Sequence, residues 1–250
     1  MTPQSSRPLI AVTGGIGSGK SFVCRLLAQR GIRVYDCDAA AKRLMRTSAT
    51  LRQQLRQLVG PQVYRGCILQ KRVLAEFLLA SEQNKQAVND VVHPAVARDF
   101  LQSDYQWLES AILFDSGFHR RVPFSRVVCV SAPEAVRVSR IVARDAITEE
   151  KAREWIRRQM PQQQVEQLSD FVILNDGLHP LAPQLDKLLS LPLAPSPTPA
   201  LPNREGDLPG QDQQKNALKG QHLLAQGNTL GNTITKCPAS WSPPPGKGYG

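Results

Sequence analysis

Four glycines, a lysine and a serine lie together near the amino end of the chain, at a spacing suited to binding a polyphosphate. Residues 14–21 read Gly-Gly-Ile-Gly-Ser-Gly-Lys-Ser, which is G-x-x-x-x-G-K-S, directly after the apolar run at 9–12. Glycines let the main chain turn so that several N–H groups point inward at the N-terminus of a helix. In such a loop Lys20 reaches the β- and γ-phosphates, and the Ser21 hydroxyl can ligate Mg²⁺. The residues expected to line the phosphate site are Gly15, Ile16, Gly17, Ser18, Gly19, Lys20, Ser21 and Phe22.

This glycine-rich segment has two other interpretations, a βα turn without a ligand and a dinucleotide-binding loop. The dinucleotide pattern is G-x-G-x-x-G, which Gly15 and Gly17 match, but its third glycine position holds Lys20. An acidic residue about 20 positions further on, Asp36 or Asp38, fits both kinds of loop. The lysine discriminates between them, because it would place a charge where close helix–strand packing needs a glycine. The pattern therefore favours a loop that binds a nucleoside triphosphate.

Two carboxylates, Asp36 and Asp38, follow the apolar segment 32–35. If that segment is a strand, its carboxyl end faces the phosphate loop, where a carboxylate could accept the proton of an attacking hydroxyl. Two carboxylates one residue apart point to opposite faces of an extended chain, so they should not share one role. Asp38 also has a structural interpretation, as the N-cap of a helix that begins at Ala39, and this does not exclude catalysis.

Two further residues are candidates for contact with an acceptor substrate. Asp115 follows the apolar segment 107–114, where a carboxylate beside the loop could orient a metal or a substrate, or could simply form a turn before Ser116 and Gly117. His93 precedes a proline between helical stretches; it could line the substrate cleft or be structural.

Arginines recur at positions 137, 140 and 144, so they share one face of an expected helix. A basic two-helix segment after the fourth strand suits a lid that closes over phosphates, excludes water and neutralises the charge that grows during transfer. We expect Arg140 and Arg144 to have this role. An ordinary solvated face is the preferred interpretation of three further arginines, Arg153, Arg157 and Arg158.

Asn175 and Gly177 follow the last expected strand, where a loop often meets the adenine base. A GTP-binding protein would be expected to offer Asn-Lys-x-Asp there, and the sequence reads Asn-Asp-Gly. This difference favours ATP over GTP as the nucleotide.

Apolar periodicity supplies the elements that must position these residues. Strands are expected at 9–13, 32–36, 107–114, 126–131 and 171–174, and helices at 21–30, 39–60, 71–105, 133–145, 149–159 and 180–191, with a loop or small hairpin at 60–69. Strands that alternate with helices predict an α/β fold of three layers, a five-stranded parallel sheet with helices on both faces and ligands at the carboxyl ends of the strands. The long helical insert at about 39–105 should form a substrate-binding subdomain, and residues 137–160 a small lid.

Composition limits the class of protein. The 250 residues carry a formal net charge of +10, which suits an anionic partner. The few aromatic residues are scattered singly, which argues against a nucleic-acid-binding surface. No apolar stretch of membrane-spanning length and no signal core is present, and the five cysteines show no metal-ligand spacing. These features indicate a cytoplasmic protein with reduced thiols, and we favour a monomer.

The last 59 residues, 192–250, differ from the rest of the chain. They hold 10 of the 19 prolines and 8 of the 17 glycines, and too few apolar residues to bury a core. The sequence predicts one globular domain over 1–191 followed by a disordered tail. A proline-rich ligand for a partner, or a segment without a selected role, remain open for that tail.

At this point the sequence resembles the dephospho-CoA kinase family, over about residues 7–190. The motifs that carry the resemblance occur in the family's order, and the second-strand aspartates together with the lid and last-strand motifs are more specific than the phosphate loop alone. The matching segments are Thr13–Ser21, Val34–Asp38, His93-Pro94, Leu113–Asp115, Arg144-Asp145, Gln159–Pro161 and Asp170–Gly177.

The resemblance implies a P-loop fold and transfer of the γ-phosphate of ATP to the 3′-hydroxyl of the ribose in dephospho-CoA. It implies that Asp38 is the general base, that Lys20 and Ser21 serve phosphate and Mg²⁺, and that Arg140 and Arg144 belong to the lid. Two positions depart from the family: Phe22 stands where Thr is usual, and Asp115 where Glu is usual. A kinase for another hydroxyl substrate and a basic nucleic-acid-binding ATPase remain the alternatives.

Overall fold

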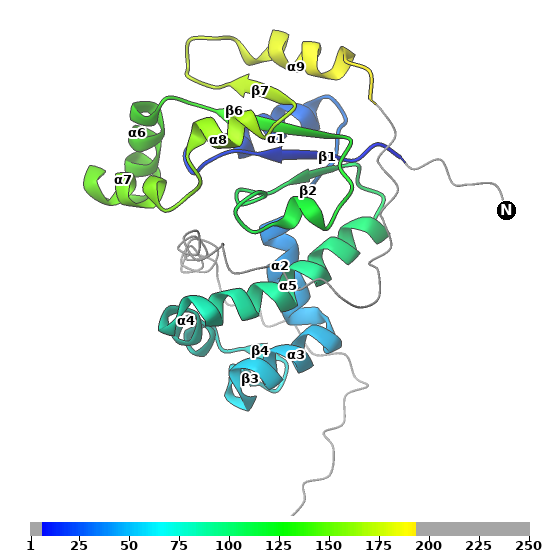
Figure 1. The fold of residues 1–250 in the computed structure, drawn as a ribbon, viewed down its shortest axis with the longest axis vertical. Coiled ribbons are helices and arrows are strands. Elements are labelled where there is room, and N and C mark those ends of the chain that lie inside the picture. Colours follow the sequence, from blue (N-terminus) through cyan, green and yellow to red (C-terminus); the bar gives the residue numbers. More distant parts are fainter. Residues whose placement is uncertain (1–6, 194–250) are drawn as a thin grey trace, which may run out of the picture.

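Five short strands form one parallel sheet in the order β2-β5-β1-β6-β7 (Figure 1). The computed structural model describes residues 7–193. The strands are β1 (Ile10–Thr13), β2 (Val34–Asp36), β5 (Trp107–Glu109), β6 (Arg126–Ser131) and β7 (Phe171–Leu174). This confirms the predicted five-stranded parallel sheet.

The side chains of the central strand β1 alternate between the two faces of the sheet, which explains why helices pack on both faces. Ile10 and Val12 face one side of the sheet, where they pack with residues of α1 (Lys20–Gln29) and α9 (Leu181–Ser190). Ala11 belongs to the other core, which α2 (Cys37–Thr47) and α5 (Glu82–Gln102) help to build. Because successive side chains of a strand point to opposite faces, one short apolar strand supports both cores.

The insert after β2 contains four helices and a small hairpin (Figure 1). Its elements are α2, α3 (Ala49–Val59), the short helix η1 (Pro61–Val63), β3 (Tyr64–Arg65), β4 (Ile68–Leu69), α4 (Lys71–Ala80) and α5. Each of the two long helices expected from the sequence is divided at a serine. Ser48 and Ser81 are N-caps whose hydroxyls accept hydrogen bonds from the N–H groups of Leu51 and Asn84. The helix α5 continues through Pro94.

One strand prediction was wrong in its length, since β5 ends at Glu109 and not at residue 114. The Ser110 N–H still donates to the carbonyl of Val12, and residues 111–117 then form turns that lead to η2 (Phe118–Arg120). Leu113 is completely buried in the core that the insert shares with the sheet, and it reaches this place from a turn. A short apolar run does not by itself distinguish a strand from a buried turn.

The segment after β6 forms three helices, α6 (Glu134–Asp145), α7 (Glu149–Arg157) and α8 (Gln162–Gln167). In Figure 1, α6 and α7 stand together at one side of the sheet. They pack around a small apolar cluster to which Ile16 of the phosphate loop also belongs. The lid segment and the loop therefore share one core.

The prediction for the carboxyl-terminal segment falls mostly on residues 194–250, which lie outside the described residues. Its first residue is placed, and the Pro192 carbonyl accepts a hydrogen bond of 2.7 Å from Arg126. Of the helices between residues 7 and 193, none has both the length and the apolar character that a membrane crossing requires.

Candidate active site

The phosphate loop runs from the end of β1 to the start of α1, and three of its four glycines adopt positive φ angles. Gly14 has φ 139°, and a Cβ there would lie 2.2 Å from the carbonyl oxygen of Val130. Gly19 has φ 90°, and a Cβ there would lie 2.1 Å from Nδ2 of Asn175. Both positions thus need glycine for the conformation and for the space. The predicted loop is present, packed closely against β6 and the segment that follows β7.

Lys20 is buried at the centre of this loop. Its Nζ donates to the carbonyls of Gly14 (2.9 Å) and Gly15 (3.3 Å), and no carboxylate of residues 7–193 forms an ion pair with it. Burial lowers the pKa of Lys20, while the carboxylates of Glu109 and Asp38 act in the opposite direction.

The Ser18 hydroxyl is also buried, and within the described residues it has no hydrogen-bond partner. An unpaired buried ammonium and an unpartnered hydroxyl inside a glycine cradle are costly unless a ligand supplies the missing contacts. The loop therefore fits an anionic group such as a triphosphate.

Some N–H groups of the loop already have acceptors within the protein. The Ile16 N–H donates to Oε1 of Gln159 at 2.7 Å, and the Phe22 N–H donates to the Gly19 carbonyl at 3.0 Å. A phosphate contact through the N–H of Ile16 or Phe22 would compete with these bonds. The phosphate-binding role expected of these two residues stays a prediction.

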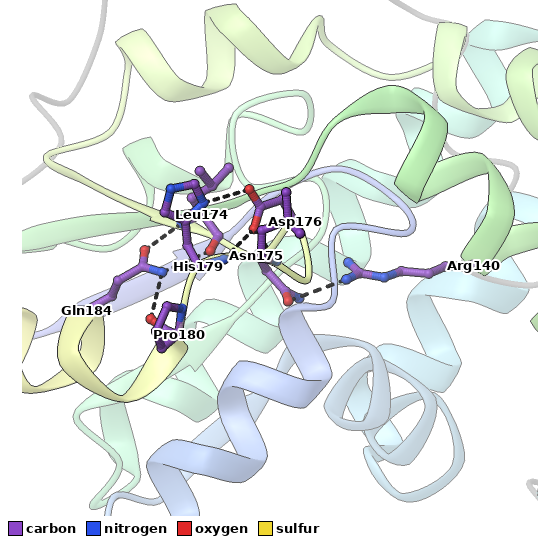
Figure 2. Close-up of polar contacts among 8 residues, drawn as sticks. Arg140, Leu174, Asn175, Asp176, His179, Pro180 and Gln184 are labelled. Carbon is purple, nitrogen blue, oxygen red and sulfur yellow. Dashed lines mark hydrogen bonds and ion pairs between the residues drawn. The ribbon is translucent and has the colours of Figure 1, made fainter.

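Two side chains hold the loop by its carbonyl oxygens. Asn175 is buried after β7, and its Nδ2 donates to the Ser18 carbonyl at 2.9 Å. Arg140 of α6 makes longer contacts to the carbonyls of Gly17 (3.4 Å) and Ser18 (3.3 Å), and to Oδ1 of Asn175 (3.4 Å). Figure 2 shows Arg140 pointing at Asn175 from the lid segment. The structure thus brings these two predicted residues together at the loop.

The segment that carries Asn175 is fixed by its own side chains (Figure 2). Asp176 accepts hydrogen bonds of 2.9 Å from the N–H groups of Leu178 and His179, and these bonds hold the pKa of its carboxyl well below the usual range. Gln184 exchanges hydrogen bonds with the N–H and carbonyl of Leu174 at 2.8 and 2.9 Å. The position of Asn175 is therefore set before any nucleotide binds.

The three arginines of α6 have different partners. Arg144 is half-exposed and pairs with the neighbouring Asp145 at 2.7 Å, while Arg140 contacts the loop. Arg137 is buried, and its Nε donates to the Ile16 carbonyl at 2.9 Å. The sequence spacing grouped the three on one helix face but could not rank them, so Arg137 was missed as a site residue.

The two second-strand aspartates have separate roles in the fold. Asp36 is the N-cap of α2, and its Oδ1 accepts from the Ala39 N–H at 2.9 Å. The cap considered for Asp38 in the sequence thus belongs to Asp36. Asp38 lies in the first helical turn, where burial and the charge of Asp36 raise its pKa to about 6, against the opposing effects of Lys42 and Lys20. This carboxyl has the proton affinity expected of a general base that works near neutral pH.

Glu109 occupies the strand-end position that the sequence analysis gave to Asp115. It ends β5 and pairs in register with Asp36; burial, opposed by the charge of Lys20, raises its pKa to about 7. Asp115 lies in the following turn, where it accepts a hydrogen bond from the Met160 N–H at 3.2 Å. The expectation that Asp115 ends the third strand was wrong, and its role in substrate binding stays a prediction.

A groove of about 700 Å³, open to solvent, lies between the sheet and the insert. Asp38, Lys42, Asn89 and His93 contribute polar groups to its lining. Burial and the charge of Arg121 lower the pKa of His93 to about 4, so His93 is neutral at physiological pH. The apolar part of the lining includes Met45, Leu78, Val88, Val92, Val96 and Phe118. The groove thus joins a candidate base to a long apolar wall, as a ligand with one polar and one less polar end requires.

No group of three or more histidine, cysteine or acidic side chains in residues 7–193 is arranged to hold a metal ion by itself. Cys24, Cys37, Cys67 and Cys129 are free thiols. The Ser21 hydroxyl, at the start of α1, is a hard oxygen donor of the kind that Mg²⁺ uses together with phosphate oxygens. The donor set fits a metal that arrives with its nucleotide.

Comparison with known proteins identifies relatives over this whole region. The family model described as "Dephospho-CoA kinase" matches residues 8–180. A dephospho-CoA kinase of Bacteroides fragilis is 40% identical over 188 residues, which cover 72% of this chain and 91% of that protein. One from Porphyromonas gingivalis is 39% identical over 197 residues, which cover 76% and 96%.

Solved structures give the same picture of the fold. A Thermus thermophilus protein superposes with a TM-score of 0.59 at 30% identity, covering 73% of this chain and 95% of that chain. A dephospho-CoA kinase from Campylobacter jejuni superposes with a TM-score of 0.50 at 19% identity, covering 72% and 93%.

Proposed function

This chain belongs to the dephospho-CoA kinase family, and from that premise we infer that it transfers the γ-phosphate of ATP to the 3′-hydroxyl of the ribose in dephospho-CoA. The product is coenzyme A, and the reaction is the last step of its biosynthesis. The observation that carries this conclusion is the family match over residues 8–180, which includes the phosphate loop, Asp38 and the groove.

We propose that Asp38 is the general base. Its carboxylate lines the groove and has a raised pKa, so at neutral pH it is mostly ionised and can take the proton of the 3′-hydroxyl as that oxygen attacks phosphorus. Asp36 already satisfies the helix N-terminus, which leaves Asp38 available to the substrate.

The phosphate loop, Lys20, Arg140 and Arg144 are proposed to bind the triphosphate and to neutralise the charge that accumulates on it. Lys20 would exchange its two carbonyl contacts for phosphate oxygens, and Arg140 already lies at the loop. Arg144 would have to leave Asp145 when nucleotide is bound. Mg²⁺, held by Ser21 and phosphate oxygens, would withdraw charge from the γ-phosphate during transfer. Asn175 is proposed to meet the adenine end of ATP.

His93, Asp115 and the groove are proposed to hold dephospho-CoA, and Lys42 is added to them from the structure. Lys42 follows Asp38 by four residues, about 6 Å along α2, and both side chains line the groove. The acceptor carries a 5′-diphosphate a few bonds from its 3′-hydroxyl. An ammonium beside the base therefore suits that diphosphate, and the apolar wall suits the pantetheine arm.

The proposed organisation is a kinase domain over 1–191, with a substrate-binding insert at about 39–105 and a lid at about 137–160, followed by a tail over 192–250. We also propose that the protein acts as a cytoplasmic monomer.

A coupled assay of ADP formation tests the function. Purified protein with MgATP and dephospho-CoA is expected to give coenzyme A, identified by mass, and Asp38→Asn is expected to abolish most turnover while MgATP still binds. A panel of nucleosides, nucleotides and shikimate-like alcohols serves as the specificity control. If one of these is phosphorylated efficiently and dephospho-CoA is not, the proposed substrate is wrong.

A further inference from the structure

Arg137 of α6 lies flat against the outside of the phosphate loop. Its residue surface is only 3% exposed, and its Nε donates to the Ile16 carbonyl at 2.9 Å. The guanidinium fills the space beside Gly15, where a Cβ would lie 2.3 Å from Nη2. The main chain of Arg137 also lies close to Gly17, where a Cβ would be 2.7 Å from the Arg137 carbonyl oxygen. Arg137 is thus in close contact with three consecutive residues of the loop.

All the hydrogen-bond acceptors of this buried guanidinium are neutral. Besides the Ile16 carbonyl, Nη1 contacts Oε1 of Gln162 at 3.4 Å, and no carboxylate between residues 7 and 193 forms an ion pair with Arg137. The acid with the strongest influence on its pKa, Glu134, is instead paired with Arg153 at 3.2 Å. Burial lowers the pKa of Arg137, although an arginine stays protonated in proteins.

A second unpaired cation lies close by. Within the described residues no carboxylate forms an ion pair with Lys20 either, and the charge of Arg137 is one of the factors that lower the pKa of Lys20. Burial of a charge is costly unless a charge of opposite sign and hydrogen bonds compensate for it. Two neighbouring buried cations at a glycine cradle therefore lack an anion in direct contact, although the carboxylates of Glu109 and Asp38 act on Lys20.

We propose that Arg137 is a positioning residue for the triphosphate of ATP. Its bond to the Ile16 carbonyl holds the loop open from outside, and the phosphates supply the negative charge that the fold does not. This inference rests on the proposed kinase function and adds to it a third arginine of α6, one that fixes the loop through the Ile16 carbonyl.

The proposal has an energetic consequence that a purely structural arginine would not have. Loss of the charge should leave the ligand-free protein as stable as before or more stable, because an uncompensated buried charge disappears. The same change should weaken nucleotide binding. A structural arginine would instead lower the stability of the ligand-free protein, and nucleotide affinity would change only through misfolding.

The experiment uses the full chain with Arg137→Gln, Arg137→Lys and, as a matched control, Arg157→Gln. Glutamine keeps an amide donor for the Ile16 carbonyl and removes the charge, while lysine keeps the charge and loses the planar fork. Arg157 is exposed and ends α7, where its loss removes one charge from the same segment without touching the loop. Calorimetry gives the Kd for MgATP, thermal melts give the ligand-free Tm, and kinetics give kcat and KM.

We expect Arg137→Gln to raise the Kd and the KM for MgATP about tenfold or more, on the scale of one charge-assisted interaction, with a ligand-free Tm equal to or above the wild-type value. We expect Arg137→Lys to stay within about threefold of the wild-type Kd, since the charge remains. Arg157→Gln should match the wild type in both measurements.

An unchanged Kd in Arg137→Gln overturns the proposal. A lower Tm in both Arg137 variants, with no recovery of affinity in Arg137→Lys, also overturns it, because that result makes the arginine structural. If the wild type itself binds no MgATP or forms no coenzyme A, the proposed function fails instead, and the two failures are distinguishable.

Discussion

The raised pKa of Asp38 predicts that turnover depends on pH in a range where an ordinary aspartate would already be ionised. The proton must be absent for Asp38 to act as a base, so activity should fall as pH falls through about 6. The shift is caused first by burial and second by the charge of Asp36, so a variant of Asp36 provides a separate test of the prediction.

The size of the effect follows from the pKa. With a value of about 6, roughly one tenth of Asp38 is ionised at pH 5 and roughly nine tenths at pH 7, so the rate should rise about tenfold between them. With the ordinary value of 3.8, the carboxyl would be almost fully ionised at both pH values, and the rate would change by less than about 10%.

The assay measures initial rates from pH 4.5 to 8.5 with both substrates held below their KM and Mg²⁺ in excess, so that the profile reports the free enzyme. Three variants accompany the wild type. Asp38→Asn should lower the rate about 10²- to 10⁴-fold. The fall in rate below about pH 6, the acid limb of the profile, should disappear in this variant. Asp36→Asn retains an acceptor for the Ala39 N–H but loses the negative charge, so the acid limb of its pH–rate profile should move to lower pH. Glu109→Gln should keep the acid limb near pH 6, because Glu109, whose pKa is about 7, is mostly uncharged while Asp38 titrates.

Two outcomes would refute the reasoning. A profile that is flat between pH 5 and 7 would mean that no group with the predicted proton affinity controls the reaction. An acid limb that persists unchanged in the residual activity of Asp38→Asn would assign the titration to another group, with Glu109, whose pKa is about 7, as the first to test.

Four further changes have outcomes that follow from the site. Lys20→Met should abolish calorimetric binding of MgATP, because the buried ammonium of the cradle is lost. Gly19→Ala should lower kcat/KM at least about 100-fold, since its φ of 90° and the 2.1 Å approach to Asn175 leave no room for a methyl group. Lys42→Gln should raise the KM for dephospho-CoA roughly fivefold to tenfold and leave kcat within about twofold in steady-state kinetics. Glu109→Gln should raise the ligand-free Tm at pH 8 but not at pH 4.5, because a carboxyl whose pKa is raised from 4.5 to about 7 destabilises the fold only when ionised.

The sequence correctly predicted the features that depend on residues close together in the chain. The loop at 14–21, the strand before it and the helix after it form one local unit, and all three are found as expected. The order of strands and helices gave the parallel sheet, because its connections follow general rules of chirality and packing.

The errors arose where several conformations fit the same residues. The apolar run at 107–114 is compatible with a strand or with a buried turn, and only packing against the insert decides that β5 ends at Glu109. This error hid Glu109 and gave its place to Asp115. The exchange of capping roles between Asp36 and Asp38 has a similar origin, since the cap depends on the exact residue at which the strand ends.

The contacts of the loop also limit how the proposed lid can move. Ile16 packs in one small cluster with Val138 and Ile141 of α6 and with Ala152 of α7. Arg137 and Arg140 bind the loop from the same helix, so α6 is fixed to the loop at its carbonyl oxygens and does not occupy its N–H groups. Closure by rotation of the whole segment 137–160 would break these contacts just where nucleotide needs a rigid cradle. Movement is therefore expected after α6, around Ala146 with its φ of 51°, where the contacts with Ile16 that it would break are those of Ala152 and Gln159. Arg144, which is half-exposed and paired with its neighbour Asp145, stands at that point.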